Sequence, residues 1–279
     1  MNNFEYKERA SSSGYGTFHI YDNLMGHKVQ ILLPKNYNNN SEKFPVIYMN
    51  DGQTAFESGG LSPWSWEVDK ALNNLHSTGL ITSPIIVAIF PNLRNDEYLP
   101  VTSFSDGKGG FISTKGQFEG YSNYLVNSLK PYIDKNYRVL NYTKTTSIIG
   151  SSFGGIAALF TALRYPEKFG ICGALSASFS VLLNSYDSDI NLEKNEIIKI
   201  MNNYILGKNT LPKIWIDAGK NEGKMSDINQ RVTEYLCSKH NFVKNENIIY
   251  FEDPLGTHDE RAWQYRFNLF LSKFYRVTN

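Results

Sequence analysis

The chain has 279 residues, a length that suits one α/β domain with a large sheet, and its 28 Lys and Arg nearly balance its 27 Asp and Glu. No long run of one charge occurs, so nothing in the sequence indicates a nucleic-acid partner or attraction to an anionic membrane. No stretch approaches 18 apolar residues and the N-terminus lacks the apolar core of a signal peptide, so we expect a cytoplasmic protein without a membrane span. Cys172 and Cys237 share no CxxC spacing, and we expect two reduced thiols.

The first regular pattern is an alternation of apolar and polar residues over 16–24 and 27–34, with Met25 and Gly26 between the two segments. This pattern predicts an antiparallel strand pair. From about residue 44 the apolar runs become continuous, which is typical of parallel strands that are covered on both faces. These runs lie at 44–52, 83–91, 145–152, 169–178, 212–219 and 246–254.

Segments with helical spacing of apolar residues separate these runs. They lie at 64–77, 121–137, 154–169, 195–206, 225–240 and 259–275. Because strands and helices alternate, we expect an α/β fold with a mostly parallel central sheet, helices on both faces and an N-terminal antiparallel strand pair. No internal repeat or long linker divides the chain, so we expect a single domain over 1–279.

The sequence Gly150-Ser151-Ser152-Phe153-Gly154 matches the pattern G-x-S-x-G between a predicted strand and a predicted helix. A turn this tight strains its central residue and lifts the side chain above the sheet edge, where the helix N-terminus favours negative charge. We therefore predict Ser152 as a nucleophile and expect Ser151 to face the packing. The alternative is an inert turn of a nucleotide-binding fold, but those folds need further glycines or a lysine that this turn lacks.

A serine needs a base to remove its proton, and an α/β-hydrolase supplies that histidine after its last strand. The five histidines are His19, His27, His76, His240 and His258. Of these, His258 alone follows the last predicted strand, and a predicted helix begins directly after it. The pattern therefore predicts His258 as the base.

An acid that orients the histidine is expected after the strand at 212–219. Glu222 lies on the loop just past Gly219, where such a carboxylate belongs. Asp217, within the strand pattern, and Asp227, near the start of the next helix, are the alternatives, and a site without a required acid stays open.

The site also needs two backbone N–H donors for the tetrahedral oxyanion. The amide of Phe153, at the predicted helix N-terminus, is one candidate. The second is expected in the loop after the strand at 44–52, at Gly52, Gln53 or Thr54.

Several segments together resemble the esterase-D-like branch of the α/β-hydrolases: "FPVIYMNDGQTAF", "LRNDEYLP", "IIGSSFGGIAALFTALRYPEKFG", "ALSASF" and "GTHDERAWQYRF". The resemblance covers about residues 25–275. This branch includes enterochelin and bacillibactin trilactone esterases, feruloyl and acetyl-carbohydrate esterases, S-formylglutathione hydrolase and antigen 85 mycolyltransferases. By position the resemblance implies Ser152 as nucleophile, His258 as base, Glu222 as acid, and Gln53 with Phe153 as oxyanion donors. Where several feruloyl-type members carry Asp, this chain carries Glu.

The resemblance also implies substrate-binding residues. Arg94 and Glu97 match a motif beside the active site of siderophore-esterase-like members, and Arg94 could bind an anionic substrate or pair with Glu97. The aromatic residues expected near the site are Trp64, Trp66, Phe56, Tyr98 and Phe179, of which Trp66 is better suited to pack as the first apolar residue of a core helix.

We therefore expect a serine esterase that uses no cofactor or metal and has a small-molecule ester as its partner. A siderophore-type or another aryl or acyl ester is the expected substrate. An acyltransferase and a general acetyl or feruloyl carbohydrate esterase are the alternatives, and a binding module that has lost catalysis is disfavoured because Ser152, His258 and Glu222 are all present.

Overall fold

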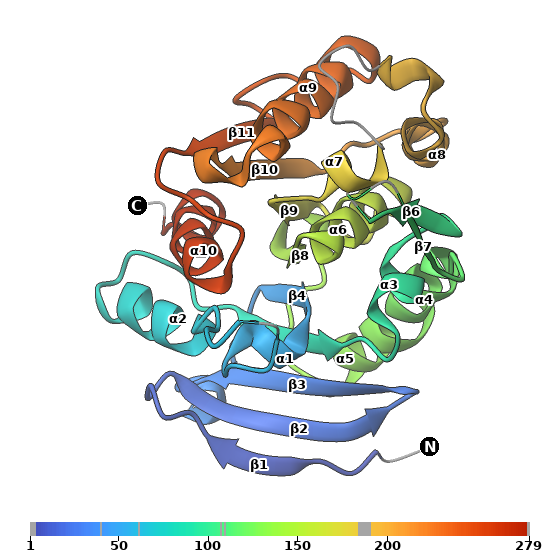
Figure 1. Ribbon diagram of the computed structural model, residues 1–279. Helices are drawn as coiled ribbons and strands as arrows, with labels where there is room; N and C mark the ends of the chain where they lie inside the picture. Colours follow the sequence, from blue (N-terminus) through green and yellow to red (C-terminus); the bar gives the residue numbers. More distant parts are fainter. Residues whose placement is uncertain are drawn as a thin grey trace.

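The computed structural model describes residues 4–39, 41–60, 62–106, 108, 110–183 and 191–277. Within these ranges a nine-stranded sheet has the order β1-β2-β3-β5-β4-β8-β9-β10-β11 (Figure 1). Its strands are β1 (Lys7–Ala10), β2 (Gly16–Leu24), β3 (His27–Pro34), β4 (Val46–Asn50), β5 (Ile85–Phe90), β8 (Thr146–Ser151), β9 (Ile171–Leu175), β10 (Lys213–Gly219) and β11 (Ile248–Asp253). A separate two-stranded hairpin joins β6 (Ser103–Ser105) to β7 (Phe111–Ser113).

The sheet has a parallel and an antiparallel part. Strands β5, β4, β8, β9, β10 and β11 pair in parallel, whereas β1, β2 and β3 pair antiparallel with one another and β3 with β5. The expected mostly parallel sheet with an N-terminal antiparallel strand pair is therefore confirmed. Strand β1 was not predicted, because all four of its residues are exposed and three are charged, so it has no alternating apolar pattern.

Helices cover both faces of the sheet. They are α1 (Gly52–Ala55), α2 (Val68–Ser77), α3 (Arg94–Tyr98), α4 (Phe118–Tyr124), α5 (Lys130–Asn136), α6 (Phe153–Arg164), α7 (Phe179–Leu182), α8 (Glu196–Ile205), α9 (Lys224–Lys239) and α10 (Glu260–Phe274). A π-helical turn at Leu125–Leu129 connects α4 to α5. Short 3₁₀ turns lie at Tyr37–Asn39, Thr143–Thr145, Leu192–Lys194 and Lys220–Glu222.

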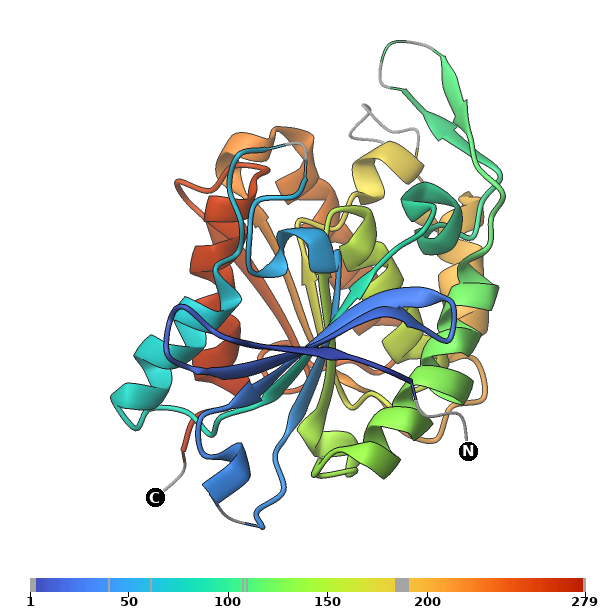
Figure 2. The same ribbon diagram turned by 90° about the horizontal axis from the view of Figure 1, so that it is seen from below.

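Two separate apolar clusters form the core, one on each face. Helices α2 and α10 pack on one face, and the layer that includes α4, α5, α6, α8 and α9 packs on the other (Figure 2). Trp66 is buried in the first cluster but precedes α2, because the helix begins four residues later than the pattern predicts. Cys172 and Cys237 are free thiols, as expected. No helix among the described residues is long and apolar enough to cross a membrane.

The topology collects the predicted catalytic segments at one edge of the sheet. Strands β4, β8, β10 and β11 run in the same direction, and each of them is followed directly by one of these segments. The carboxyl ends of parallel strands lie at the same edge of a sheet, which is where open α/β sheets bind their ligands.

Candidate active site

Ser152 lies in a strained turn between β8 and α6. Its backbone has φ 57° and ψ −125°, a conformation that non-glycine residues rarely adopt. The turn is tight enough that a Cβ at Gly150 would lie 2.4 Å from the carbonyl oxygen of Gly154. Ser151 is buried at the end of β8, as expected. The two glycines therefore permit the turn, and the turn separates the two serines.

The Ser152 side chain has a neighbour that the sequence interpretation did not assign. Its Oγ lies 3.0 Å from the Oγ of Ser178, whose backbone N–H donates to the Ser152 carbonyl at 3.3 Å. Among the described residues no hydrogen bond joins Ser152 to His258, but both line one cavity of about 240 Å³. Hydrogen bonds between nucleophile and base are often long in unliganded enzymes, so this arrangement suits a resting site.

His258 and Glu222 form the expected pair at the other wall. Glu222 ends the 3₁₀ turn that follows β10, and His258 lies on the loop between β11 and α10. The His258 Nδ1 is 2.7 Å from the Glu222 Oε2. Because this contact occupies Nδ1, the Nε2 of His258 is the nitrogen that remains to accept a proton.

The Glu222 carboxylate is buried within a dense set of donors. Its Oε1 accepts hydrogen bonds from the Ser176 hydroxyl at 2.7 Å, the Gly219 amide at 2.6 Å and the Arg266 guanidinium at 3.2 Å. Burial acts to raise the pKa of Glu222, but the hydrogen bond from His258 and the charge of Arg266 outweigh it, so the pKa lies below its usual range. Glu222 is therefore ionised at neutral pH.

The two alternative acids lie elsewhere. Asp217 is fully buried in β10 and accepts a hydrogen bond from Arg266 at 2.7 Å. Burial raises the pKa of Asp217 to about 6, against the opposing charge of Arg266. Asp227 lies exposed in the first turn of α9. Of the three carboxylates, Glu222 alone contacts His258 among the described residues.

The predicted oxyanion donors begin two short helical segments. Gln53 is in α1, which follows Asp51, and Phe153 is the first residue of α6. Amides in the first turn of a helix have no carbonyl one turn earlier to bond to, so they are available to an anion. Gln53 lines the cavity together with Ser152.

Arg94 binds Asp51 rather than Glu97, so the alternative of an Arg94–Glu97 bridge is wrong. The Nε and Nη2 of Arg94 each donate to one oxygen of Asp51, both at 2.7 Å, and Nη2 also reaches the Ser151 carbonyl at 3.4 Å. Asp51 itself has a left-handed backbone with φ 61°. Glu97 instead lies 3.2 Å from the His27 Nε2. Arg94 thereby joins the loop of Gln53 to the turn of Ser152.

Two aromatic side chains expected to line the site do not reach it. Tyr98 and Phe179 are inaccessible to solvent, whereas Trp66 packs in the core, which is the position favoured for it from the sequence. Tyr98 instead accepts a hydrogen bond from the Asp51 amide at 2.9 Å, so it helps to fix the loop that contains Asp51. The expectation that these rings form an aromatic rim is therefore wrong.

Most residues that line the cavity are instead polar or charged, although much of the surface they present to it is apolar. Phe56 is nearly buried, and Trp64 is 44% exposed beside the guanidinium of Arg261. The residues that line the cavity are Asp51, Gln53, Thr54, Gly60, Ser62, Arg94, Ser151, Ser152, His258, Glu260 and Trp263.

Several supporting residues were missed by the sequence interpretation: Asp51, Ser176, Ser178, Glu260 and Arg266. In the sequence, the only indication of these residues was their position within or next to the motifs quoted above. Within the described ranges no group of three or more His, Cys, Asp or Glu side chains is arranged to hold a metal ion.

The chain is similar to several known proteins. A family model described as putative esterase matches residues 25–274. The uncharacterised protein YbbA of Bacillus subtilis is 28% identical over 151 residues, which are 53% of this chain and 56% of that protein. An endo-1,4-beta-xylanase/feruloyl esterase of Xylanibacter ruminicola is 32% identical over 139 residues, which are 48% of this chain but 17% of that protein. The matches thus span little more than half of one relative and a small part of the other.

A solved structure agrees at the level of the fold. An IroE-like serine hydrolase from Shewanella oneidensis has a TM-score of 0.68 at 18% identity, with 97% of this chain and 80% of that one covered. The resemblance to the esterase-D-like branch and the expected α/β-hydrolase fold are both confirmed. Because the family model covers most of the sequence, the chain belongs to the putative esterase family.

Proposed function

We propose that this protein hydrolyses carboxylic esters through an acyl-enzyme on Ser152. The observation that carries the proposal is one cavity with a strained serine at one wall and the His258–Glu222 pair, 2.7 Å apart, at the other. A nucleophile, a base and an orienting carboxylate are the three groups that acyl transfer requires. The family description and the printed names of similar proteins, which include a feruloyl esterase, agree with this chemistry.

The reaction begins when the Ser152 hydroxyl rotates from Ser178 toward His258. Its oxygen then forms a bond to the acyl carbon while the Nε2 of His258 takes its proton. The carbonyl electrons move to the oxygen, and the amides of Phe153 and Gln53 hold that oxyanion. Glu222, already ionised, stabilises the imidazolium.

Collapse of the tetrahedral intermediate breaks the bond to the alkoxide. His258 protonates the departing alcohol and becomes neutral again, which leaves the acyl group on Ser152. Water then attacks the acyl carbon as His258 takes its proton. The second collapse releases the carboxylic acid and returns the proton to Ser152.

Charge in the cavity favours uncharged esters as substrates. Arg94 is committed to Asp51 by two hydrogen bonds, so its charge is already neutralised. Glu260, which is almost buried, adds a carboxylate to the wall and accepts a hydrogen bond from Ser62. An anionic substrate would meet this carboxylate without an unpaired cation among the described lining residues.

The volume of the cavity, about 240 Å³, also suits a small acyl group better than a bulky one. The proposal therefore ranks small uncharged aryl and alkyl esters ahead of feruloyl esters, and both ahead of siderophore-type trilactones.

A covalent probe tests the catalytic assignment. Treatment with a fluorophosphonate followed by peptide mapping is expected to label Ser152, because the probe reacts with activated serines. Ser152→Ala is expected to lose both the label and about 10³- to 10⁶-fold in kcat on phenyl acetate, as serine hydrolases generally do. Ser151→Ala is the matched control and keeps the label. A label on Ser151, or near-normal activity of Ser152→Ala, contradicts the proposal.

A substrate panel tests the ranking. Phenyl acetate, methyl ferulate and a catecholate trilactone are compared by kcat/KM, and we expect the values to fall in that order. Glu260→Gln removes the wall charge, so we expect it to raise kcat/KM for an anionic ester and to change phenyl acetate little. A trilactone as the best substrate would overturn the ranking while leaving the role of Ser152 intact.

A further inference from the structure

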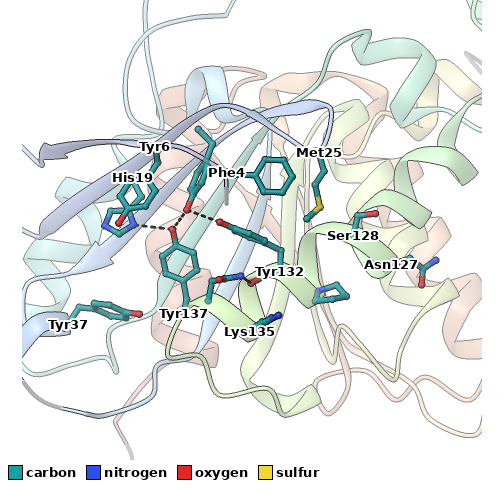
Figure 3. A pocket seen from close by; sticks show the side chains of 13 residues that line it. Phe4, Tyr6, His19, Met25, Tyr37, Asn127, Ser128, Tyr132, Lys135 and Tyr137 are labelled. Carbon is teal, nitrogen blue, oxygen red and sulfur yellow. Dashed lines mark hydrogen bonds between the residues drawn. The ribbon is translucent and has the colours of Figure 1, made fainter. Parts of the chain in front are cut away.

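A second, larger cavity lies away from Ser152. Its volume is about 910 Å³, within the range of small-molecule sites, and it shares no lining residue with the catalytic cavity. Strand β2 and the chain before β1 form one side of it, and the π-helical turn with α5 forms the other (Figure 3). Its lining residues are Phe4, Tyr6, His19, Tyr21, Met25, Tyr37, Asn127, Ser128, Pro131, Tyr132, Lys135, Asn136 and Tyr137.

Aromatic rings make up much of the cavity wall, and several of these rings are partly exposed to solvent. Tyr6 is 43% exposed, and its ring stacks on His19 with centroids 4.1 Å apart. Phe4 meets Tyr132 edge to face at 5.6 Å, and both rings are partly exposed. Lys135 is the only lining residue with a permanent formal charge. The cavity therefore offers apolar surface and hydrogen bonds rather than a charged site.

The hydroxyls in the cavity form a chain with one direction. Tyr132 donates to Tyr21 at 3.3 Å, Tyr21 lies 2.7 Å from Tyr137, and Tyr137 lies 3.0 Å from the His19 Nδ1 (Figure 3). The other His19 nitrogen, Nε2, lies 3.4 Å from a Glu8 oxygen, and the charge of that carboxylate favours the ring proton on Nε2.

Burial lowers the pKa of His19 more than the charge of Glu8 raises it, so the ring is neutral at pH 7 and Nδ1 accepts. Tyr137 must then donate to His19, and Tyr21 must donate to Tyr137. Burial raises the pKa of both tyrosines, which keeps these protons in place. Every proton in the chain therefore points toward His19.

This direction decides what a ligand has to provide. Tyr21 and Tyr137 are buried, so the hydroxyl of the partly exposed Tyr132, which donates its own proton to Tyr21, is the acceptor of this chain that a ligand can reach. The side chains of Asn127, Ser128 and Asn136 add further donors and acceptors to the wall. A ligand that matches this wall combines several hydroxyls with apolar ring faces that can stack on Tyr6 and Tyr132. A simple phenol has a face but a single donor. A sugar ring has C–H faces and several hydroxyls.

We propose that this tyrosine-lined cavity is a second binding site, separate from the catalytic cavity, and that it binds a short neutral oligosaccharide. Such a site would hold the protein on a carbohydrate without using the catalytic residues. The proposal does not rest on the proposed esterase function, because binding is independent of Ser152.

Calorimetric titration of the full chain carrying Ser152→Ala tests this site without turnover. The probes are xylotetraose and cellotetraose, with trigalacturonate and p-nitrophenol as anionic and phenolic comparators. We expect saturable binding of at least one neutral tetrasaccharide at millimolar concentrations, and weaker binding of both comparators. The absence of saturable binding by either tetrasaccharide, or tighter binding of a comparator, overturns the proposal.

Variants locate the binding. Tyr132→Phe removes the first hydroxyl of the chain and Tyr6→Ala removes the exposed ring, and each is expected to weaken binding about 3- to 10-fold. Tyr142→Phe is the matched control, because Tyr142 is exposed outside this cavity and is expected to leave binding unchanged. Thermal unfolding of each variant checks that the fold is intact. Equal binding by all three variants would contradict this location.

Discussion

Two arginines support residues of the proposed catalytic site, in different surroundings. Arg266 is completely buried and bonds both Asp217 and Glu222, which supports the wall of the base. Arg94 keeps 33% of its side chain exposed and bonds Asp51, which supports the wall of the oxyanion donors. The ion pairs of Arg266 are therefore buried in the core, whereas the ion pair between Arg94 and Asp51 lies close to the surface.

The elements around the two arginines explain this difference. Arg266 projects from α10, a 15-residue helix, toward β10, which lies next to the edge strand β11 of the sheet. Arg94 is the first residue of α3, and Asp51 directly precedes α1. These helices have five and four residues, so they have little stability of their own. Substitution of Arg266 should therefore affect both folding and catalysis. Substitution of Arg94 should affect mainly the geometry of the site.

Removal of the negative charge of Glu222 has the largest expected effect on kcat. Glu222→Gln keeps the shape but cannot stabilise the imidazolium or impose the tautomer, so we expect kcat to fall about 10²- to 10⁴-fold. Because the pKa of Glu222 lies below its usual range, the wild-type acid limb of the pH profile should not report this carboxylate. Asp227→Asn, an exposed neighbour, serves as control and keeps full activity. A small effect of Glu222→Gln would point to a catalytic dyad.

Removal of Arg266 tests whether its cluster also supports folding. Arg266→Met leaves the Asp217 and Glu222 carboxylates buried without their cation, and breaking such a pair costs about 3–5 kcal/mol of unfolding free energy. Urea denaturation measures this loss. Arg261→Met, exposed on the same helix, is expected to change stability by less than about 0.5 kcal/mol. Equal stability of both variants would remove Arg266 from the folding argument.

Arg94→Lys tests the oxyanion wall. Lysine keeps the charge but cannot bind both oxygens of Asp51, so the loop of Gln53 should shift relative to Ser152. We expect kcat on phenyl acetate to fall about 10- to 100-fold with little change in KM, because misplaced donors weaken the transition state rather than binding. Unfolding free energy should stay near the wild-type value.

The control for Arg94 is Arg164→Lys, which alters a partly buried ion pair with Glu119 at the far end of α6. It should leave kcat unchanged. A rise in KM without a fall in kcat for Arg94→Lys would instead assign Arg94 to substrate binding.

The two walls also differ in how far the sequence predicted them. His258 and Glu222 were predicted because each follows a strand with a clear apolar pattern, and chain order then limits the choice. The partner of Arg94 was not predicted, since pairing across 43 residues depends on the left-handed backbone of Asp51, which no periodicity reveals. Glu97, one helical turn from Arg94, was one of the two partners considered for it, but α3 turns Glu97 toward His27.

The aromatic residues illustrate the same limit at the level of packing. Tyr98 and Phe179 lie on segments beside the site, and the sequence cannot say which face of a short helix is covered. In the structure both rings are buried, and most residues that line the cavity are polar or charged types instead. The strands and long helices were predictable because their apolar patterns extend over many residues, and short connecting helices carry too few residues for such a pattern.

Ser178 allows the finest test, because it touches the nucleophile and belongs to neither arginine cluster. Its hydroxyl lies 3.0 Å from the Ser152 Oγ, and when His258 takes the serine proton, Ser178 is left to donate to the oxygen. Ser178→Ala removes one hydrogen bond of about 0.5–1.5 kcal/mol, so we expect kcat to fall about 2- to 12-fold. The rate of fluorophosphonate labelling should fall by the same factor, since both reactions need the oriented oxygen. If the hydroxyl of Ser178 instead held Ser152 away from His258, both rates would rise, and that result would make the resting contact inhibitory.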